Sequence, residues 1–288
     1  MSRSPQSPPP AAERPRRGRR RRLAGLRAIV TGASSGVGRA VARELARRGV
    51  HLLATARREE PLAELAAEPP APGGRGIEFV AGDVCLPEVR SRLVETAADR
   101  LGGIDIVVAA AGGGAIGSFA ESTPDTLRRI MEVDFFAPAE LIRESLPLLR
   151  RGRDPAVVLV GSILGCHPLP LHAEYCAAKA AVRSLAGTLR MELAADGIDV
   201  LLASLGPTES EFWNNLVSGS RPRWSRGRQM SAARTAAAIA AGLERRSTEI
   251  LPGLAAKGFF IAARFFPSLI DAVVKRRMDS DRRPSATR

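Results

Sequence analysis

The feature that most restricts the fold of this chain is an alternation that begins at Leu26 and continues to about residue 250. Short apolar runs, rich in β-branched residues, are separated by longer segments with apolar residues at helical spacing. The short runs predict buried strands, and the longer segments predict amphipathic helices. Because strands that alternate with helices build βαβ units, we predict an α/β fold, a doubly wound parallel sheet of about seven strands with helices on both faces.

The alternation assigns most of the chain to individual elements. The predicted strands are 27–31, 51–55, 77–81, 104–109, 156–161, 199–203 and 249–251. The predicted helices are 37–48, 87–100, 122–150, 173–195 and 231–246. A chain of 288 residues with 45% apolar residues suits one large domain with a buried core.

Charge is concentrated at the two ends of the chain. The formal net charge is +13, but residues 1–22 hold eight arginines and one glutamate, and residues 275–288 hold six basic and two acidic residues. The body of the chain is therefore nearly neutral and does not suit specific recognition of nucleic acid, which needs an ordered basic surface. We predict a disordered, basic Pro/Arg-rich tail over 1–23, a folded domain over 24–252, and a C-terminal segment with a basic tail over 253–288.

The three cysteines, Cys85, Cys166 and Cys176, form neither an even disulfide set nor a metal-ligand spacing. This pattern favours a reducing compartment, so we predict a cytoplasmic protein with no metal site.

A glycine-rich turn follows the first predicted strand and opens the first predicted helix. It reads Val30-Thr31-Gly32-Ala33-Ser34-Ser35-Gly36-Val37-Gly38. The first glycine permits a tight turn, the second lets the backbone approach a pyrophosphate, and the third allows close packing, while the N–H groups of the helix start point at the anion. The turn predicts a Rossmann-type dinucleotide site formed by Gly32, Ser34, Ser35, Gly36, Val37 and Gly38.

The end of the second predicted strand indicates which dinucleotide binds. An acidic residue about 20 positions after the glycines would accept hydrogen bonds from the ribose 2′-hydroxyl of NAD. This chain instead has Thr55-Ala56-Arg57-Arg58 there. Since a guanidinium pairs well with a phosphate, we predict that Arg57 holds the 2′-phosphate of NADP and that NAD is the less favoured cofactor.

The glycine turn and Gly82-Asp83-Val84, which follows the third predicted strand, resemble the short-chain dehydrogenase/reductase family. With the motifs described next, the resemblance covers about residues 24–252, which we therefore expect to be an NAD(P)-binding catalytic domain. It implies that Asp83 receives the adenine amino group. It also implies cofactor contacts from Val84, Ala110, Gly112, Gly206, Thr208 and Ser210.

A Tyr-x-x-x-Lys pair begins the predicted helix 173–195. The four-residue spacing places Tyr175 and Lys179 on one helix face, and an ammonium beside a phenol favours the phenolate. Ser162 directly follows the fifth predicted strand, 13 residues before Tyr175, a spacing that the family also has. At the carboxyl edge of a parallel sheet, its hydroxyl would steady the substrate oxygen while Tyr175 donates or accepts the proton.

The chain departs from the family at three places. The family has a catalytic Asn that supports a water-mediated proton relay through the lysine. Asp134 replaces it here, and we still expect Asp134 to support that relay. The family's Asn-Asn-Ala-Gly is Ala109-Ala110-Ala111-Gly112, with a loss of side-chain hydrogen bonds, and its Pro-Gly after the sixth strand is Leu205-Gly206. The resemblance therefore implies an enzyme, with Ser162, Tyr175, Lys179 and Asp134 as its catalytic residues.

The segments beside these residues predict an apolar substrate pocket, lined by Leu164, Cys166, Leu169, Phe212 and Trp213. Such a pocket suits a hydrophobic ketone or secondary alcohol. We predict an NADP-preferring oxidoreductase acting on such a substrate, with Tyr175 as general acid and base. Two alternatives stay open, a cofactor-binding regulator with little or no turnover and a membrane-surface enzyme that reduces lipid ketones.

The segment 254–274 is rich in Phe, Ile and Leu but is interrupted by Lys257, Arg264, Pro267 and Asp271. A bilayer-spanning helix needs about 20 continuous apolar residues, so this segment is too broken to span. We expect either a helix that packs over the substrate cleft or onto a partner subunit, or an amphipathic segment in peripheral contact with a membrane. The family resemblance also implies a homodimer or homotetramer, formed through the helix that starts near Tyr175 and the long helix before it.

Overall fold

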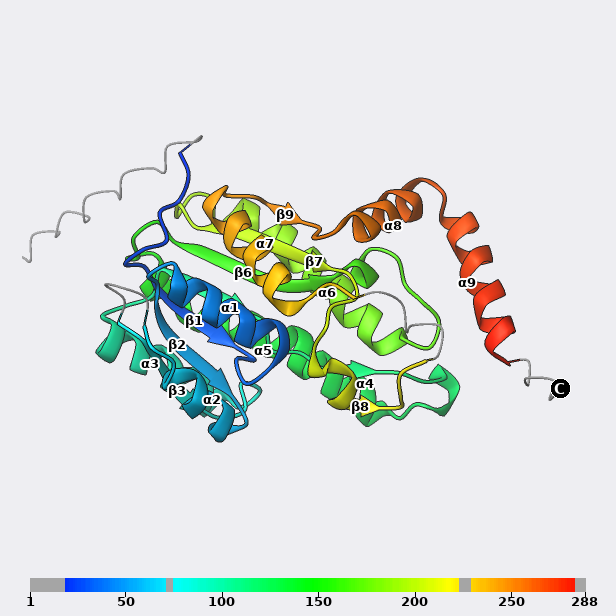
Figure 1. Cartoon of the computed structure of the whole chain (residues 1–288), viewed down its shortest axis with the longest axis horizontal. Helices are drawn as coiled ribbons and strands as arrows, with labels where there is room; N and C mark the ends of the chain where they lie inside the picture. Colours follow the sequence, from blue (N-terminus) through cyan, green and yellow to red (C-terminus); the bar gives the residue numbers. More distant parts are fainter. Residues whose placement is uncertain (1–18, 71–74, 223–228, 283–288) are drawn as a thin grey trace, which may run out of the picture.

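The computed structural model describes residues 19–70, 75–222 and 229–282. Its centre is a parallel sheet with the strand order β3-β2-β1-β4-β6-β7-β9 (Figure 1). The seven strands are β1 (Arg27–Thr31), β2 (His51–Ala56), β3 (Ile77–Ala81), β4 (Ile106–Ala109), β6 (Ala156–Ser162), β7 (Asp199–Leu205) and β9 (Glu249–Ile250). The predicted α/β fold is confirmed, because every strand pair in this sheet is parallel.

Helices cover both faces of the sheet, and each face has its own apolar cluster. On one face the clustered residues come from α1 (Gly36–Arg47), α2 (Glu59–Ala66) and α7 (Ala232–Glu244). On the other face they come from α3 (Pro87–Thr96), α5 (Ala137–Leu149) and α6 (Ala173–Glu192). Alternate side chains of one strand enter different clusters, as with Val30 and Ile29 of β1, because successive side chains point to opposite faces.

The predicted helix 122–150 is divided in the structure. It consists of α4 (Pro124–Met131), a π-helical turn over Glu132–Phe136, and α5. Thr123 caps the start of α4 by accepting a hydrogen bond from the Thr126 N–H, and Pro124 occupies the first turn, where its missing N–H has no cost. The π-helical turn changes the helix phase and places Asp134, only 1% exposed, in the interior.

Two short strands were not predicted. β5 (Gly114–Ala115) and β8 (Leu216–Ser218) pair in a separate two-stranded sheet. They connect the loop after β4 with the loop after β7, which are distant in sequence. Elements of two or three residues are too short for a periodicity signal, so only their tertiary pairing defines them.

The first residues that the structure describes differ from the predicted tail. Residues 1–18 lie outside the described residues, but Arg21 and Leu23 are each 3% exposed. The Arg21 guanidinium donates to the carbonyl oxygens of Asp154, Pro155 and Leu243. The predicted disorder over 1–23 is therefore wrong for its last residues, because Arg21 finds buried hydrogen-bond acceptors that sequence composition does not reveal.

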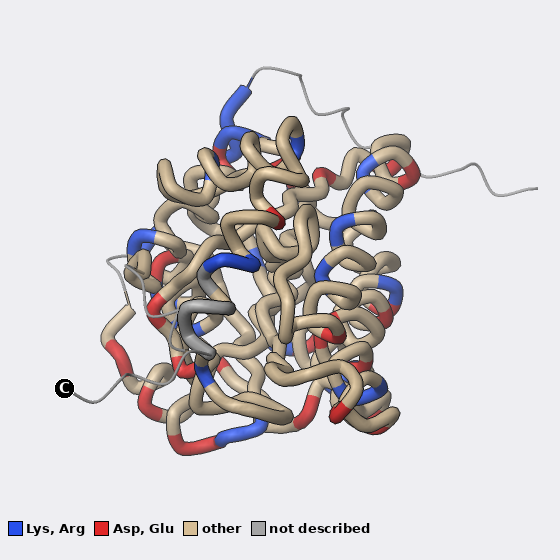
Figure 2. Tube along the Cα trace, turned by 90° about the vertical axis from the view of Figure 1, so that its right-hand side faces the viewer, with Lys and Arg blue, Asp and Glu red and all other residues tan. Residues whose placement is uncertain are grey.

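Basic and acidic residues are interspersed along the tube in Figure 2, and basic residues gather at the start of the described chain. The C-terminal segment forms α8 (Leu254–Phe265) and α9 (Pro267–Arg282), which lie beyond the last strand of the sheet (Figure 1). Among the described residues, no helix is long and apolar enough to cross a membrane.

Candidate active site

The site forms at the carboxyl edge of the sheet, where the strand order reverses. From β1 the chain builds outward to β2 and β3, and from β4 it builds to the other side. Gly32 after β1 and Ala110 after β4 therefore face each other at the point where open α/β sheets bind ligands. The contact is tight, because a Cβ at Gly32 would lie 2.9 Å from the carbonyl oxygen of Ala110, and φ at Gly32 is +69°.

The glycine turn leaves the start of α1 available to an anion. Ser35, the N-cap of α1, makes no side-chain capping hydrogen bond to the first turn. Gly38 lies against the carbonyl group of Gly32, so close that a side chain there would displace the turn. The turn is thus compact, and the Ser35 side chain does not cap the N–H groups at the helix start, an arrangement that fits the pyrophosphate of a dinucleotide. Val37 packs against the core, and the neighbouring Ser34 and Ser35 are half-buried.

The end of β2 carries a contact that the sequence did not reveal. Arg57 is exposed directly after the strand, and the next residue, Arg58, forms an ion pair of 2.7 Å with Glu211. The guanidinium of Arg58 also lies 3.4 Å from the Ser34 hydroxyl. The pKa of Glu211 is lowered by its hydrogen bond to Arg58 and, less strongly, by Ser35. A carboxylate therefore already lies among the groups that would hold phosphate.

Asp83 and Val84 follow β3, where the resemblance places the adenine contact. The Asp83 carboxylate accepts a hydrogen bond of 3.0 Å from the Cys85 N–H, and its carbonyl accepts one from Leu86. Val84 is buried against the apolar cluster that contains α3. These bonds fix the turn, and one Asp83 carboxylate oxygen keeps its capacity for a further donor.

Ser162, Tyr175 and Lys179 meet at the end of β6. Ser162 is the last residue of the strand, and its hydroxyl lies within hydrogen-bonding reach of the Tyr175 phenol. Both Tyr175 and Lys179 lie in the first turns of α6, with the Lys179 ammonium 5.6 Å from the centre of the Tyr175 ring. Lys179 is buried, 6% exposed, and donates to the Val160 carbonyl oxygen at 3.2 Å. The three predicted proton-handling residues are thus brought together.

The direction of the Tyr175 pKa corrects our sequence-based expectation. Burial raises the pKa of Tyr175, and the charge of Asp134 raises it further, whereas Lys179 and the Ser162 hydrogen bond lower it. The net pKa is above the usual value, not below it. The expectation considered the ammonium alone, but desolvation of the phenolate outweighs that attraction. At neutral pH the phenol is therefore protonated and ready to donate.

Asp134, on the π-helical turn, lies next to Lys179. Its Oδ1 is 3.2 Å from the Lys179 ammonium and accepts a hydrogen bond of 3.1 Å from the Gly113 N–H. Its Oδ2 is buried and has no hydrogen-bond partner among the described residues. Burial raises the pKa of Asp134 and lowers that of Lys179, but the mutual attraction keeps the pKa of Lys179 above its usual value.

The loop after β4 is held without the side-chain bonds that the family's asparagines would supply. The Thr31 hydroxyl accepts hydrogen bonds from the N–H groups of Ala110 and Ala111, at 3.0 and 2.9 Å. Gly112 has no room for a side chain, because a Cβ there would lie 2.7 Å from Oδ1 of Asp134. Thr31, a residue of the glycine turn, therefore ties the two sides of the site together.

The loop after β7 carries the remaining predicted cofactor residues. A Cβ at Gly206 would lie 3.0 Å from the Ala256 methyl group of α8. The Thr208 hydroxyl donates to the Gly206 carbonyl oxygen, and the Ser210 hydroxyl accepts from the Phe212 N–H. Ser210 also lies against Gly36, where a Cβ would come within 2.8 Å of the Ser210 Cβ. The loop thus crosses toward the glycine turn.

Aromatic side chains form one wall beside Tyr175. The Phe212 ring meets the Tyr175 ring edge to face at 5.4 Å, and Trp213 meets Phe212 at 5.3 Å. The other predicted pocket residues, Leu164, Cys166 and Leu169, lie half-buried on the segment between β6 and α6. The wall next to the phenol is therefore apolar and suits a hydrophobic substrate.

Comparison with known proteins decides the family. A family profile described as short chain dehydrogenase matches residues 27–221, which include the glycine turn and the Ser-Tyr-Lys group. The chain belongs to the short-chain dehydrogenase family. Members of this family are NAD(P)-dependent oxidoreductases, and the predicted family assignment is confirmed.

Individual members of the family are similar in sequence. Hydroxysteroid 11-beta-dehydrogenase 1-like protein from Macaca fascicularis is 35% identical over 180 residues, 62% of this chain and 62% of that protein. The human Dehydrogenase/reductase SDR family member 2, mitochondrial, is 34% identical, over 70% of this chain and 71% of that protein. The first of these alignments thus spans about three-fifths of its relative's length.

Solved structures of the family have the same architecture. A short-chain dehydrogenase from Streptomyces avermitilis is 29% identical, has a TM-score of 0.74, and covers 89% of this chain and 98% of its own. A short chain dehydrogenase from Burkholderia cenocepacia in complex with NADP is 25% identical, has a TM-score of 0.75, and covers 88% and 99%.

Proposed function

We propose that this chain is an NADP-preferring oxidoreductase that interconverts a hydrophobic ketone and the corresponding secondary alcohol. The observation that carries the proposal is the convergence of Ser162, Tyr175 and Lys179 at the end of β6, across the sheet edge from the uncapped start of α1. This combination supplies an anion site, a proton donor and a charge that stabilises the deprotonated donor.

Each residue has a distinct role in reduction. The bound dinucleotide would supply the hydride to the carbonyl carbon. The protonated Tyr175 donates its proton to the carbonyl oxygen, and Ser162 donates a hydrogen bond as negative charge develops on that oxygen. The Lys179 ammonium stabilises the tyrosinate that remains. In oxidation the same tyrosinate accepts the proton of the alcohol, so Tyr175 is both general acid and base.

The preference for NADP is supported by charge at the end of β2. Arg57 and Arg58 follow the strand, and no carboxylate occupies the position that would bind a ribose 2′-hydroxyl. The Burkholderia protein described in complex with NADP supports this choice by likeness. The name of the macaque relative and the aromatic wall beside Tyr175 both support a bulky apolar substrate.

The test is NADPH and NADH binding by the purified full chain, followed by NADPH oxidation with a panel of apolar ketones. We expect tighter binding of NADPH and turnover of at least one ketone. Arg57→Ala and Arg58→Ala are expected to weaken NADPH binding more than NADH binding, because only NADPH carries the 2′-phosphate. Tight binding of NADPH with no turnover of any ketone would favour the cofactor-binding regulator instead.

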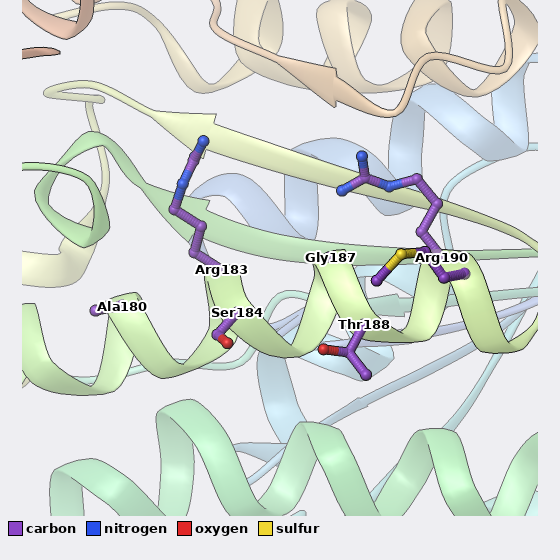
Figure 3. Close-up of a pocket in the computed structure, with 7 residues that line it drawn as sticks. Ala180, Arg183, Ser184, Gly187, Thr188 and Arg190 are labelled. Atoms are coloured by element: carbon purple, nitrogen blue, oxygen red, sulfur yellow. The ribbon is translucent and has the colours of Figure 1, made fainter.

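We also propose that α6 forms a contact between copies of the chain. Its outer face carries a shallow groove of about 530 Å³, lined by Ala180, Arg183, Ser184, Gly187, Thr188, Arg190 and Met191 (Figure 3). Small side chains permit close helix packing, and Met191 is 74% exposed. A Cβ at Gly187 would have no neighbour nearer than 3.9 Å, so the variant Gly187→Arg can place a Cβ there without displacing a neighbour in its own chain. Light scattering is expected to show a dimer or tetramer for the wild type and a smaller species for the variant; equal masses would contradict this contact.

A further inference from the structure

Exposed apolar side chains gather at the C-terminal end of the described chain. Six of the eleven exposed large hydrophobic residues that the structure describes lie between positions 254 and 273. They are Leu254, Ile261, Phe265, Phe266, Leu269 and Val273, with exposures from 43% to 86%. A group of this kind is unusual on a water-exposed surface and indicates a contact with another apolar phase.

The exposed and buried residues of α8 divide cleanly by helical position. Leu254, Ile261 and Phe265 are spaced by seven and four residues and share one face. The opposite side is anchored: Ala256 and Ala263 are buried, and the Phe259 ring packs against His167 at 5.9 Å. Helix α8 therefore already packs on the protein through its other side, and the exposed apolar side chains lie outside that contact.

The turn into α9 continues the apolar surface. Phe266, directly after Phe265, is 62% exposed, and Leu269 in the first turn of α9 is 60% exposed. Asp271 of α9 contacts the segment between β6 and α6, because its carboxylate lies 3.1 Å from the His167 ring. Both helices lie beyond the β9 side of the sheet in Figure 1. We define Leu254, Ile261, Phe265, Phe266 and Leu269 as the C-terminal apolar face.

The charges beside this face indicate its partner. Lys257 and Arg264 on α8 are exposed, and neither forms an ion pair with a carboxylate of the described residues. Lys275 and Arg276 on α9 are also exposed. Between positions 254 and 276 the acidic residue is Asp271, whose carboxylate lies 3.1 Å from the His167 ring. Exposed apolar side chains bordered by cations match a surface that is apolar inside and anionic outside.

We propose that the C-terminal apolar face docks on an anionic lipid bilayer, with the aromatic side chains inserted among the acyl chains and the cations at the phosphates. A second copy of the chain is a poorer occupant, because a twofold contact would place the same cationic surface against itself. In the docked chain α8 would lie between the lipid and the loops after β7 and β6, since its buried side packs on Gly206 and His167. The inference stands apart from turnover and does not require the proposed function.

The test is co-sedimentation of the purified full chain with vesicles of phosphatidylcholine alone or mixed with phosphatidylglycerol. The wild type is expected to bind the mixed vesicles, less strongly as salt rises. The double variant Phe265→Ser, Phe266→Ser is expected to bind about tenfold more weakly or worse, because two inserted rings are lost. Lys257→Glu with Arg264→Glu is expected to remove the preference for phosphatidylglycerol.

Phe119→Ser is the matched control, because Phe119 is 68% exposed on a different part of the chain. It is expected to bind vesicles as the wild type does, and circular dichroism of all variants checks folding. A chain without residues 1–18 separates the arginine-rich tail from the C-terminal face and is expected to keep binding. The proposal is overturned if the wild type ignores anionic vesicles, if the tail deletion alone abolishes binding, or if the phenylalanine variant changes molar mass instead of vesicle binding.

Discussion

Asp134 gives the proton-handling group of this chain a second buried charge. Where the family has a neutral asparagine, a carboxylate lies 3.2 Å from the Lys179 ammonium and is completely shielded from water. The ammonium that would favour the Tyr175 phenolate is thereby partly neutralised. Burial is the main cause that raises the pKa of Tyr175 above its usual value, and the Asp134 charge adds to it, a direction suited to proton donation in ketone reduction.

The Asp134→Asn variant tests this coupling. Loss of the carboxylate leaves the charge of Lys179 unopposed, so the pKa of Tyr175 is expected to fall. Alcohol oxidation needs deprotonated Tyr175, and the acid limb of its pH profile is therefore expected to move to lower pH. The measurement is the pH dependence of kcat/KM for oxidation.

Glu132→Gln is the matched control, since Glu132 lies on the same π-helical turn and makes no ion pair with Lys179. Its profile is expected to stay at the wild-type position. An Asp134→Asn profile that stays in place or moves to higher pH would contradict the coupling.

The place of a single residue in the fold can be predicted where residue type and spacing are the signal. Gly32, Tyr175 and Lys179 lie where the sequence placed them, because backbone reach and helical spacing are local properties. The direction of the Tyr175 pKa was not predictable in the same way. It depends on how completely α6, β6 and the π-helical turn exclude water, which is a tertiary property.

At the scale of elements, the loop after β7 lies across the cofactor side of the sheet. Glu211 begins a short helical turn in that loop and reaches Arg58 at the end of β2. The same region carries Phe212, which touches Tyr175. One segment therefore contacts both the expected phosphate position and the expected substrate wall.

Because Glu211 holds Arg58, the carboxylate is expected to compete with a cofactor phosphate. Glu211→Gln removes the competing charge and should lower the Kd for NADPH several-fold, within the range of one charge-assisted hydrogen bond. The measurement is a fluorescence titration with NADPH. Glu209→Gln, exposed two residues earlier, is the control and is expected to leave the Kd unchanged. An equal or higher Kd for Glu211→Gln would show that the pair does not oppose binding.

The elements themselves were largely predictable, and the exceptions have physical reasons. β1 and β3 match their predicted bounds, since each is an apolar run closed by turn residues. The segment 122–150 keeps helical spacing throughout, so the sequence could not indicate the π-helical turn that orients Asp134. The Arg58–Glu211 pair joins residues 153 positions apart and has no local signal.

At the scale of the molecule, Arg21 connects the start of the described chain to β7 and α7. Its guanidinium is 1% exposed and lies 2.6 Å from the Asp199 carboxylate at the start of β7. The same group donates to the Leu243 carbonyl oxygen at the end of α7. Burial lowers the pKa of Arg21, because the charged guanidinium is removed from water. The charged form is stabilised by these hydrogen-bond acceptors.

Arg21→Ala is expected to lower the free energy of unfolding by about 2–3 kcal/mol, because several buried acceptors lose their donor. Urea denaturation followed by circular dichroism measures the change. Arg22→Ala, an exposed neighbour with the same side chain, is expected to have little effect. Equal losses in the two variants, or a negligible loss at Arg21, would show that the segment is not anchored in this way.

Tyr175 is the residue on which the proposed reduction depends most directly. The decisive measurement compares NADPH-dependent ketone reduction and NADPH binding in the wild type and in Tyr175→Phe, which keeps the ring against Phe212 but removes the hydroxyl. We expect turnover to fall by about two orders of magnitude or more while the Kd for NADPH stays close to the wild-type value. Turnover by Tyr175→Phe at the wild-type rate would contradict Tyr175 as the proton donor.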